Sequence, residues 1–274
     1  MDPRAQRTWP RRACAAGALV AAVVLLAAPP AGAELVGEFN ARLKGVKTWG
    51  AYTAVFESRV YETDGSPPPD LGQAEIRFPR GAAIRKHFLR PPFFCDVVRL
   101  EATNDPAVCP TSHFGSGHML LDGRPWIEVA VTADIELFLG RPETPGSVAT
   151  ALALVRSNER SPAYDFQVLR GTLVPDSGRY GYRLILPTNL KPRIGGTKLR
   201  LAELSMTIGG LSTVRRGRKL FWTRVPACPR ARRVAFAATY AFVGEAPIDK
   251  RRRINCRRFV RHPTVERRGR IPDK

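Results

Sequence analysis

The sequence predicts an all-β protein: an antiparallel β-sandwich, jelly-roll-like or barrel-like, that is stapled by disulfides. Three observations predict this class. Apolar and polar residues alternate along several segments, turn residues separate these segments, and an even number of cysteines follows residue 33. No segment beyond that point shows a long amphipathic-helix period, so a sandwich or barrel is the expected architecture.

Residues 1–33 have the three-part layout of a secretory signal peptide. Four arginines precede an apolar stretch at 13–28, and the small residues Ala31-Gly32-Ala33 follow it. The apolar stretch is shorter than the roughly 20 residues that span a bilayer comfortably. We therefore expect cleavage after Ala33 and no transmembrane segment in the mature chain, with retention as a membrane anchor as the alternative.

Alternation with a period of two is clearest between Trp126 and Leu139. Its apolar positions all fall on one face of an extended chain, whereas a helix would scatter them around its axis. This pattern predicts a long strand with one face in a core and the other in water. The same alternation predicts strands at 52–60 and 234–242, and shorter β-like runs lie at 74–78, 148–155, 166–174 and 180–186.

Two local irregularities are also informative. Pro175-Asp176-Ser177-Gly178 separates two of the short runs, which predicts a hairpin because Pro and Gly favour turn conformations. Within 198–208 the apolar phase slips by one residue near Ala202-Glu203. A β-bulge at that point would keep both halves of the strand facing the core.

Four cysteines follow the signal: Cys95, Cys109, Cys228 and Cys256. In an oxidising compartment they predict two disulfides, with three possible connectivities. Pairing Cys95 with Cys109 and Cys228 with Cys256 closes the shortest loops and is the connectivity we expect. Each bridge would contribute about 3 to 4 kcal/mol, so reduction should destabilise the protein.

The histidines near the first two cysteines do not predict a metal site. The order Cys95, Cys109, His113, His118 is superficially that of a zinc finger, but the two cysteines are too far apart. We expect no metal and no cofactor, and we expect both histidines to flank the entry to a strand with exposed imidazoles. Ser116 lies in Gly-Ser-Gly without the nucleophile-elbow pattern, which favours a solvated serine between turn glycines.

Few other residues suggest chemistry. Asp134 and Glu136 share one face of a predicted strand, a spacing compatible with the paired carboxylates of glycoside hydrolases. An ordinary solvated face with arginine or lysine partners explains the same spacing and is favoured. Trp222 lies within a basic run, where an aromatic ring beside arginines could meet a sugar or a lipid head group.

The chain carries a large positive charge. Its formal net charge is +20, and removal of four arginines and Asp2 with the signal leaves 40 basic and 23 acidic residues, near +17. This excess favours contact with polyanions. Basic residues concentrate at 215–233 and at 250–274, and the expected polyanion-binding residues are Arg215, Arg216, Arg218, Lys219, Arg230, Arg232, Arg233, Arg251, Arg252, Arg253, Arg257 and Arg258.

Two segments, His113–Asp122 and Cys228 to Cys256, resemble those of uncharacterised exported β-rich proteins of high-GC bacteria. The resemblance implies export and β structure. It implies no particular site.

These observations divide the chain into a signal peptide at 1–33, a β-sandwich domain at 34–256 and a disordered basic tail at 257–274. We expect a non-catalytic protein, secreted or in the cell envelope, that contacts anionic wall polymers or lipid head groups through its basic C-terminal region. The alternative is a secreted carbohydrate-active enzyme of jelly-roll type that uses a carboxylate pair. Nucleic acid is a less expected partner because exported proteins rarely meet it.

Overall fold

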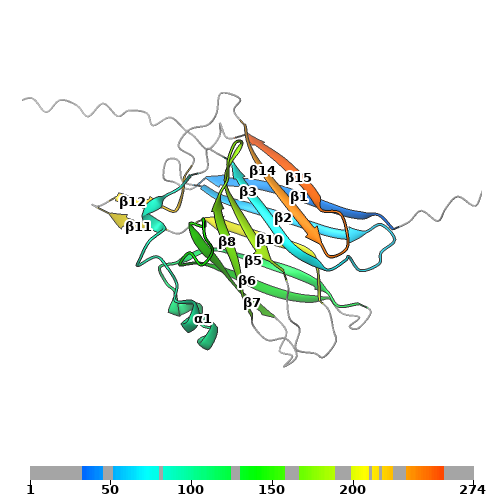
Figure 1. Cartoon of the computed structure of the whole chain (residues 1–274), viewed down its shortest axis with the longest axis horizontal. Helices are drawn as coiled ribbons and strands as arrows, with labels where there is room; N and C mark the ends of the chain where they lie inside the picture. The colour runs from blue at the N-terminus through cyan, green and yellow to red at the C-terminus, as the bar shows by residue number, and fades with distance from the viewer. Residues whose placement is uncertain are drawn as a thin grey trace, which may run out of the picture.

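A computed structural model of the protein describes residues 33–45, 52–79, 83–124, 130–157, 167–188, 199–209, 212–215, 218–224 and 233–255. Within these residues eleven antiparallel strands form one sheet that curves until it nearly closes into a barrel (Figure 1). The predicted all-β class is confirmed. The strands of this sheet are β1 (Leu35–Gly45), β2 (Tyr52–Glu62), β3 (Leu71–Pro79), β5 (His113–Asp122), β6 (Val131–Gly140), β7 (Ala149–Ser157), β8 (Gln167–Pro175), β9 (Tyr180–Pro187), β10 (Arg200–Gly209), β14 (Arg233–Phe242) and β15 (Ile248–Asn255).

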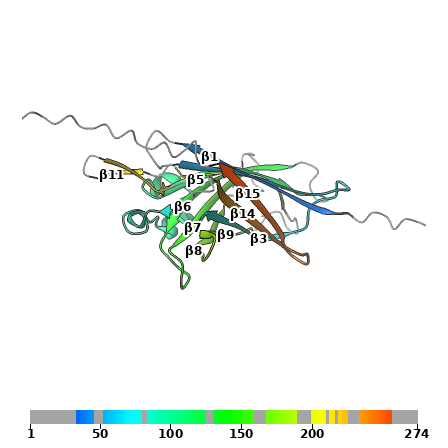
Figure 2. The same ribbon diagram turned by 90° about the horizontal axis from the view of Figure 1, so that it is seen from above.

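The order of strands around the sheet is β1-β2-β10-β5-β6-β7-β8-β9-β3-β14-β15. The edge strands β1 and β15 lie beside each other, as Figure 2 shows from above. Gly37 on β1 faces β15 so closely that a Cβ there would lie 3.0 Å from Cγ2 of Ile248. We call this junction the seam. Two small sheets accompany the barrel: β11 (Ser212–Arg215) pairs with β12 (Arg218–Phe221), and β4 (Ala83–Ile84) pairs with β13 (Thr223–Arg224).

The alternating residues fill the inside of the barrel as predicted. On β6, Val131, Ala133, Ile135 and Leu137 are all at most 3% exposed and belong to one apolar cluster. The long strand predicted from Trp126 begins in the structure at Val131, and residues 125–129 lie outside the described part of the chain.

Both predicted irregularities occur where the sequence placed them. The β8–β9 hairpin is confirmed, with Leu173 opposite Leu184 and a turn in which Gly178 has a φ of 76°. On β10 the register with β5 shifts between Leu201 and Glu203, which is the predicted β-bulge. Both Leu201 and Leu204 are therefore buried.

A disulfide closes a loop within an external segment that packs on the barrel. Cys95 is bonded to Cys109, which confirms the predicted pair, with the two Cα atoms 5.0 Å apart. The segment around them carries the helix α1 (Val97–Thr103) and two 3-10 turns, Lys86–Phe88 and Pro106–Val108. Leu100 of α1 packs with Leu152 on the outer face of the sheet, so this segment builds a second small core outside the barrel. Cys228 and Cys256 lie outside the described residues.

The glycines beside Ser116 correct one prediction. Gly115 and Gly117 lie inside β5 and not in a turn, and the strand already begins at His113. A Cβ on Gly117 would lie 2.2 Å from the carbonyl oxygen of Ser205 on β10. The physical reason for glycine here is the close approach of two backbones.

One polar contact crosses the interior. The hydroxyls of Ser58 on β2 and Tyr240 on β14 share a hydrogen bond, although these strands are not neighbours in the sheet. Burial raises the pKa of Tyr240 to about 12 from an ordinary value of 10.0.

This raised pKa predicts a late tyrosine titration. The unfolded chain loses the Tyr240 proton near pH 10 and the folded chain near 12, so this residue's stabilising effect is full below pH 10 and falls as the pH rises to 12. An absorbance titration of the phenolates should show a phase near pH 12 that Tyr240→Phe removes. A variant that retained this phase while folded would contradict the assignment.

Candidate functional site

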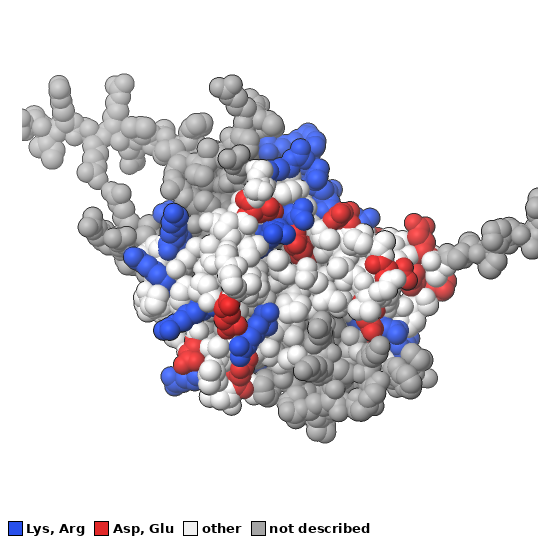
Figure 3. Space-filling model, in the orientation of Figure 1, with Lys and Arg blue, Asp and Glu red and all other residues white. Residues whose placement is uncertain are grey.

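The edge strand β15 carries three consecutive exposed arginines, Arg251, Arg252 and Arg253. Lysine and arginine side chains gather where Figure 1 draws β15, and acidic side chains gather near the start of β1 at the other end of the barrel (Figure 3). Within the described residues none of the three arginines forms an ion pair. We call Arg251, Arg252 and Arg253 the basic edge.

Apart from Arg233, the other described arginines of the large sheet have acidic partners. Arg170 binds Glu101 of α1 through two nitrogens, with the shortest N···O distance at 2.7 Å. Ion pairs also engage Arg42, Arg59, Arg77, Arg124, Arg156, Arg183 and Arg200. Among the described residues, the arginines of the large sheet without an acidic partner are therefore Arg233 and the three of the basic edge.

Some of the remaining predicted polyanion-binding residues lie in the described part of the chain and others lie outside it. Arg233 is exposed and lies opposite Asn255, so the chain enters β14 and leaves β15 at the same end of the barrel. The backbone of the β11–β12 hairpin places Arg215 opposite Arg218 and Val214 opposite Lys219. Outside the described residues lie Arg216, Arg230, Arg232, Arg257 and Arg258.

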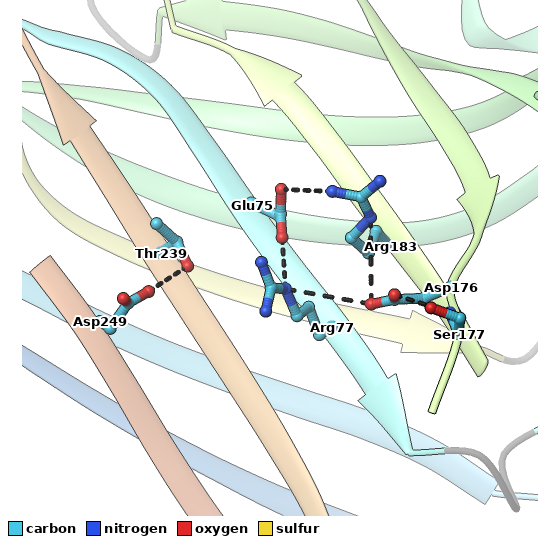
Figure 4. Close-up of polar contacts among 7 residues, drawn as sticks. All are labelled: Glu75, Arg77, Asp176, Ser177, Arg183, Thr239 and Asp249. Atoms are coloured by element: carbon cyan, nitrogen blue, oxygen red, sulfur yellow. Dashed lines mark hydrogen bonds and ion pairs between the residues drawn. The ribbon is translucent and has the colours of Figure 1, made fainter. Parts of the chain in front are cut away.

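Next to the basic edge, a compact charge network covers the outer face of β3 and β9 (Figure 4). The side chain of Glu75 is only 9% exposed and accepts hydrogen bonds from Arg77 and, at 3.4 Å, from Nη1 of Arg183. A carboxylate oxygen of Asp176 lies 4.0 Å from Arg77 and 3.9 Å from Arg183. The hydrogen bond that Arg77 donates to Glu75 raises the pKa of Arg77. Two acids and two arginines neutralise each other, so this network is structural and adds nothing to the basic edge.

On the other side of the seam, residues of five adjacent strands, together with Arg252 of β15, line a groove of about 890 Å³. It runs over β1, β2, β10, β5 and β6. The strand registers place residues in two rows along it, polar except for Leu120. One row is Asn40, Glu57, Ser205 and His118, with Asp134 beside the groove, and the other is Glu38, Arg59, Glu203, Leu120 and Thr132. We call this cavity the polar groove. Sequence reasoning missed it because the residues come from four separate regions of the chain.

Charged groups in the polar groove are paired yet accessible. Glu57 binds Arg42 and accepts a hydrogen bond from the Asn40 amide at 3.2 Å. Arg59 lies 3.3 Å from Glu203, and both side chains are at least 50% exposed. A polar ligand could therefore replace some of these ion pairs and hydrogen bonds with its own contacts.

The carboxylate pair singled out in the sequence has the ordinary partners of a solvated sheet face. Asp134 accepts a hydrogen bond from Nδ1 of His118 at 2.5 Å. Glu136 binds Arg156 and lies 3.9 Å from Nε2 of His113. Both imidazoles are exposed as expected, His118 at 76% and His113 at 43% of their side-chain surface.

Ser205, His118 and Asp134 lie in register, which is the spatial order of a serine hydrolase triad. The Ser205 hydroxyl, however, makes no hydrogen bond to the imidazole, although both residues lie within the described part of the chain. The row therefore lacks the contact that activates a nucleophile.

Trp222, which the sequence suggested could meet a ligand, is not accessible to one. Its side chain is 1% exposed and packs against Phe114, with ring centroids 4.8 Å apart. An indole surrounded by charged sequence neighbours still gains most by burial, because it carries a large apolar surface.

The fold and these surfaces define a class: an antiparallel, nearly closed β-barrel with a disulfide-containing outer segment, one basic edge and one polar groove. Comparisons with protein-family models, curated proteins and solved structures find no match to the chain. Among the described residues no group of three or more His, Cys, Asp or Glu side chains is placed to hold a metal ion. In the same part of the chain, no helix has the length and apolarity needed to cross a membrane.

Proposed function

We propose that the mature protein acts outside the cytosol as a non-catalytic binder of anionic surface polymers, and that the basic edge is its contact surface. The observation that carries this proposal is the run of exposed arginines on β15 without acidic partners among the described residues. Polyanions bind such a surface by releasing condensed counterions. The Cys95–Cys109 disulfide supports an oxidising compartment, and the signal-like residues 1–33 support export.

The test is salt-dependent retention on immobilised heparin. Reversing two charges with Arg251→Glu and Arg253→Glu should sharply lower the eluting salt concentration and reduce the slope of log K against log salt by about 2. The matched control reverses two exposed arginines elsewhere, Arg141→Glu and Arg179→Glu, and so changes the net charge equally. Equal losses in both variants would show that overall charge alone causes retention and would contradict a specific edge.

The basic tail at 257–274 is tested separately. It continues from the end of β15, so we propose that it extends the same contact surface. Deleting it should weaken retention on heparin or isolated cell wall. Unchanged retention would remove the tail from the proposal and leave the folded edge.

A further inference from the structure

We infer that the polar groove binds a hydroxyl-rich segment of the polymer whose acidic groups contact the basic edge, which makes the preferred ligand an anionic glycan. This inference rests on the proposed function and specifies its ligand class. It depends on how the two surfaces join and on the chemistry of the groove lining.

Arg252 joins the two surfaces. It belongs to the basic edge, and it also lines the polar groove. On β15 it lies opposite the buried Phe236, on the side of the strand that faces the core, whereas Arg251 and Arg253 alternate to the other side. Because β15 lies beside β1, Arg252 stands where the seam meets the groove. A single extended ligand can therefore touch both surfaces.

The lining of the groove suits hydroxyl groups better than a run of phosphates. Its charged residues are Glu38, Glu57 and Glu203 against Arg59 and Arg252, which leaves a net charge near −1. Carboxylates accept hydrogen bonds from hydroxyls, and arginines donate to them. A string of phosphates would instead meet three carboxylates and gain little. Of the uncharged polar residues of the lining, Asn40, Thr132 and Ser205 add further donors and acceptors, whereas the Ser58 hydroxyl is bonded to Tyr240.

The size of the groove agrees with this ligand. Its volume of about 890 Å³ lies near the upper end of the range of about 300 to 1,000 Å³ for small-molecule sites. Both strands that form its centre, β10 and β5, are held at close approach by Gly117, so the floor is set by backbone and not by mobile loops. The groove thus offers a preformed polar surface beside a cationic edge.

The experiment compares two polyanions of equal charge by calorimetric titration at one salt concentration: an oligogalacturonate, an oligosaccharide with two free hydroxyls for each carboxylate, and linear polyphosphate. The wild-type mature protein should bind the oligosaccharide about tenfold more tightly than polyphosphate. Ser205→Trp, which fills the groove floor, should abolish this preference and leave polyphosphate binding unchanged. The control Ser116→Trp places the same ring on β5, at an exposed position outside the groove lining, and should retain the preference.

The outcomes separate this inference from the proposed function. Equal wild-type affinity for the two probes, or an unchanged preference in Ser205→Trp, would overturn the groove assignment while the basic edge still stood. Loss of binding to both probes only in the Arg251→Glu and Arg253→Glu variant would support the edge. If that variant bound both probes like wild type, the proposed function itself would fail.

Discussion

Replacing Glu75 by alanine should destabilise the barrel by about 3 kcal/mol. Removing one member of a buried ion pair leaves its partners uncompensated, at a typical cost of about 3 to 5 kcal/mol. Here Glu75 is the least exposed member of its network and holds both Arg77 and Arg183. The lower end of the range applies because both arginine side chains are more than a third exposed and retain some hydration.

Denaturant unfolding of Glu75→Ala measures this loss as a lower midpoint with an unchanged slope. The matched control is Glu101→Ala, which also removes a carboxylate with an arginine partner but at a position where the side chain is 37% exposed. Its cost should stay below about 1 kcal/mol. Equal costs for the two variants would show that burial of Glu75 adds nothing to its ion pairs.

Replacing Gly117 by alanine should cost at least about 3 kcal/mol. Inserting atoms into a well-packed core typically costs about 1 to 3 kcal/mol when side chains can adjust. At Gly117 the nearest atom is the backbone oxygen of Ser205, 2.2 Å from the position of the new Cβ, so β5 and β10 themselves would have to separate. That separation would also widen the floor of the polar groove.

Thermal or denaturant unfolding again gives the measurement. Gly72→Ala is the control because its new Cβ would have its nearest neighbour at an ordinary 3.6 Å, the backbone oxygen of Ala241. This variant should unfold within about 0.5 kcal/mol of wild type. If Gly117→Ala were equally harmless, the two strands would not be held together as closely as the structure shows.

Sequence pattern predicted those features that depend on local periodicity. The alternation on β6, the hairpin after Pro175 and the bulge near Glu203 each follow from where apolar side chains must point along one strand. The Cys95–Cys109 bridge followed from loop length. In each case the signal lies within about thirty consecutive residues or fewer.

Features that depend on distant strands were not predictable in this way. β10 inserts between β2 and β5, and this placement alone brings Glu57, Ser205 and His118 into one row. Two strands were also not predicted: β1 and the arginine-rich edge strand β15. Their composition resembles that of exposed loops or tails. The burial of Trp222 was not predicted, because its charged sequence neighbours carry no information about which residues pack against it across the core.

The number of strands has a consequence for the molecule's behaviour in concentrated solution. Antiparallel neighbours reverse direction at each step, so β1 and β15, the first and the last of eleven strands, run in the same direction. The antiparallel hydrogen-bond pattern of the sheet therefore cannot continue across the seam between them. Unsatisfied main-chain groups at such a border invite association with a second molecule. Three adjacent guanidinium groups on the final strand oppose that association by mutual repulsion, so the residues proposed to hold a polymer also work against edge-to-edge pairing of two barrels.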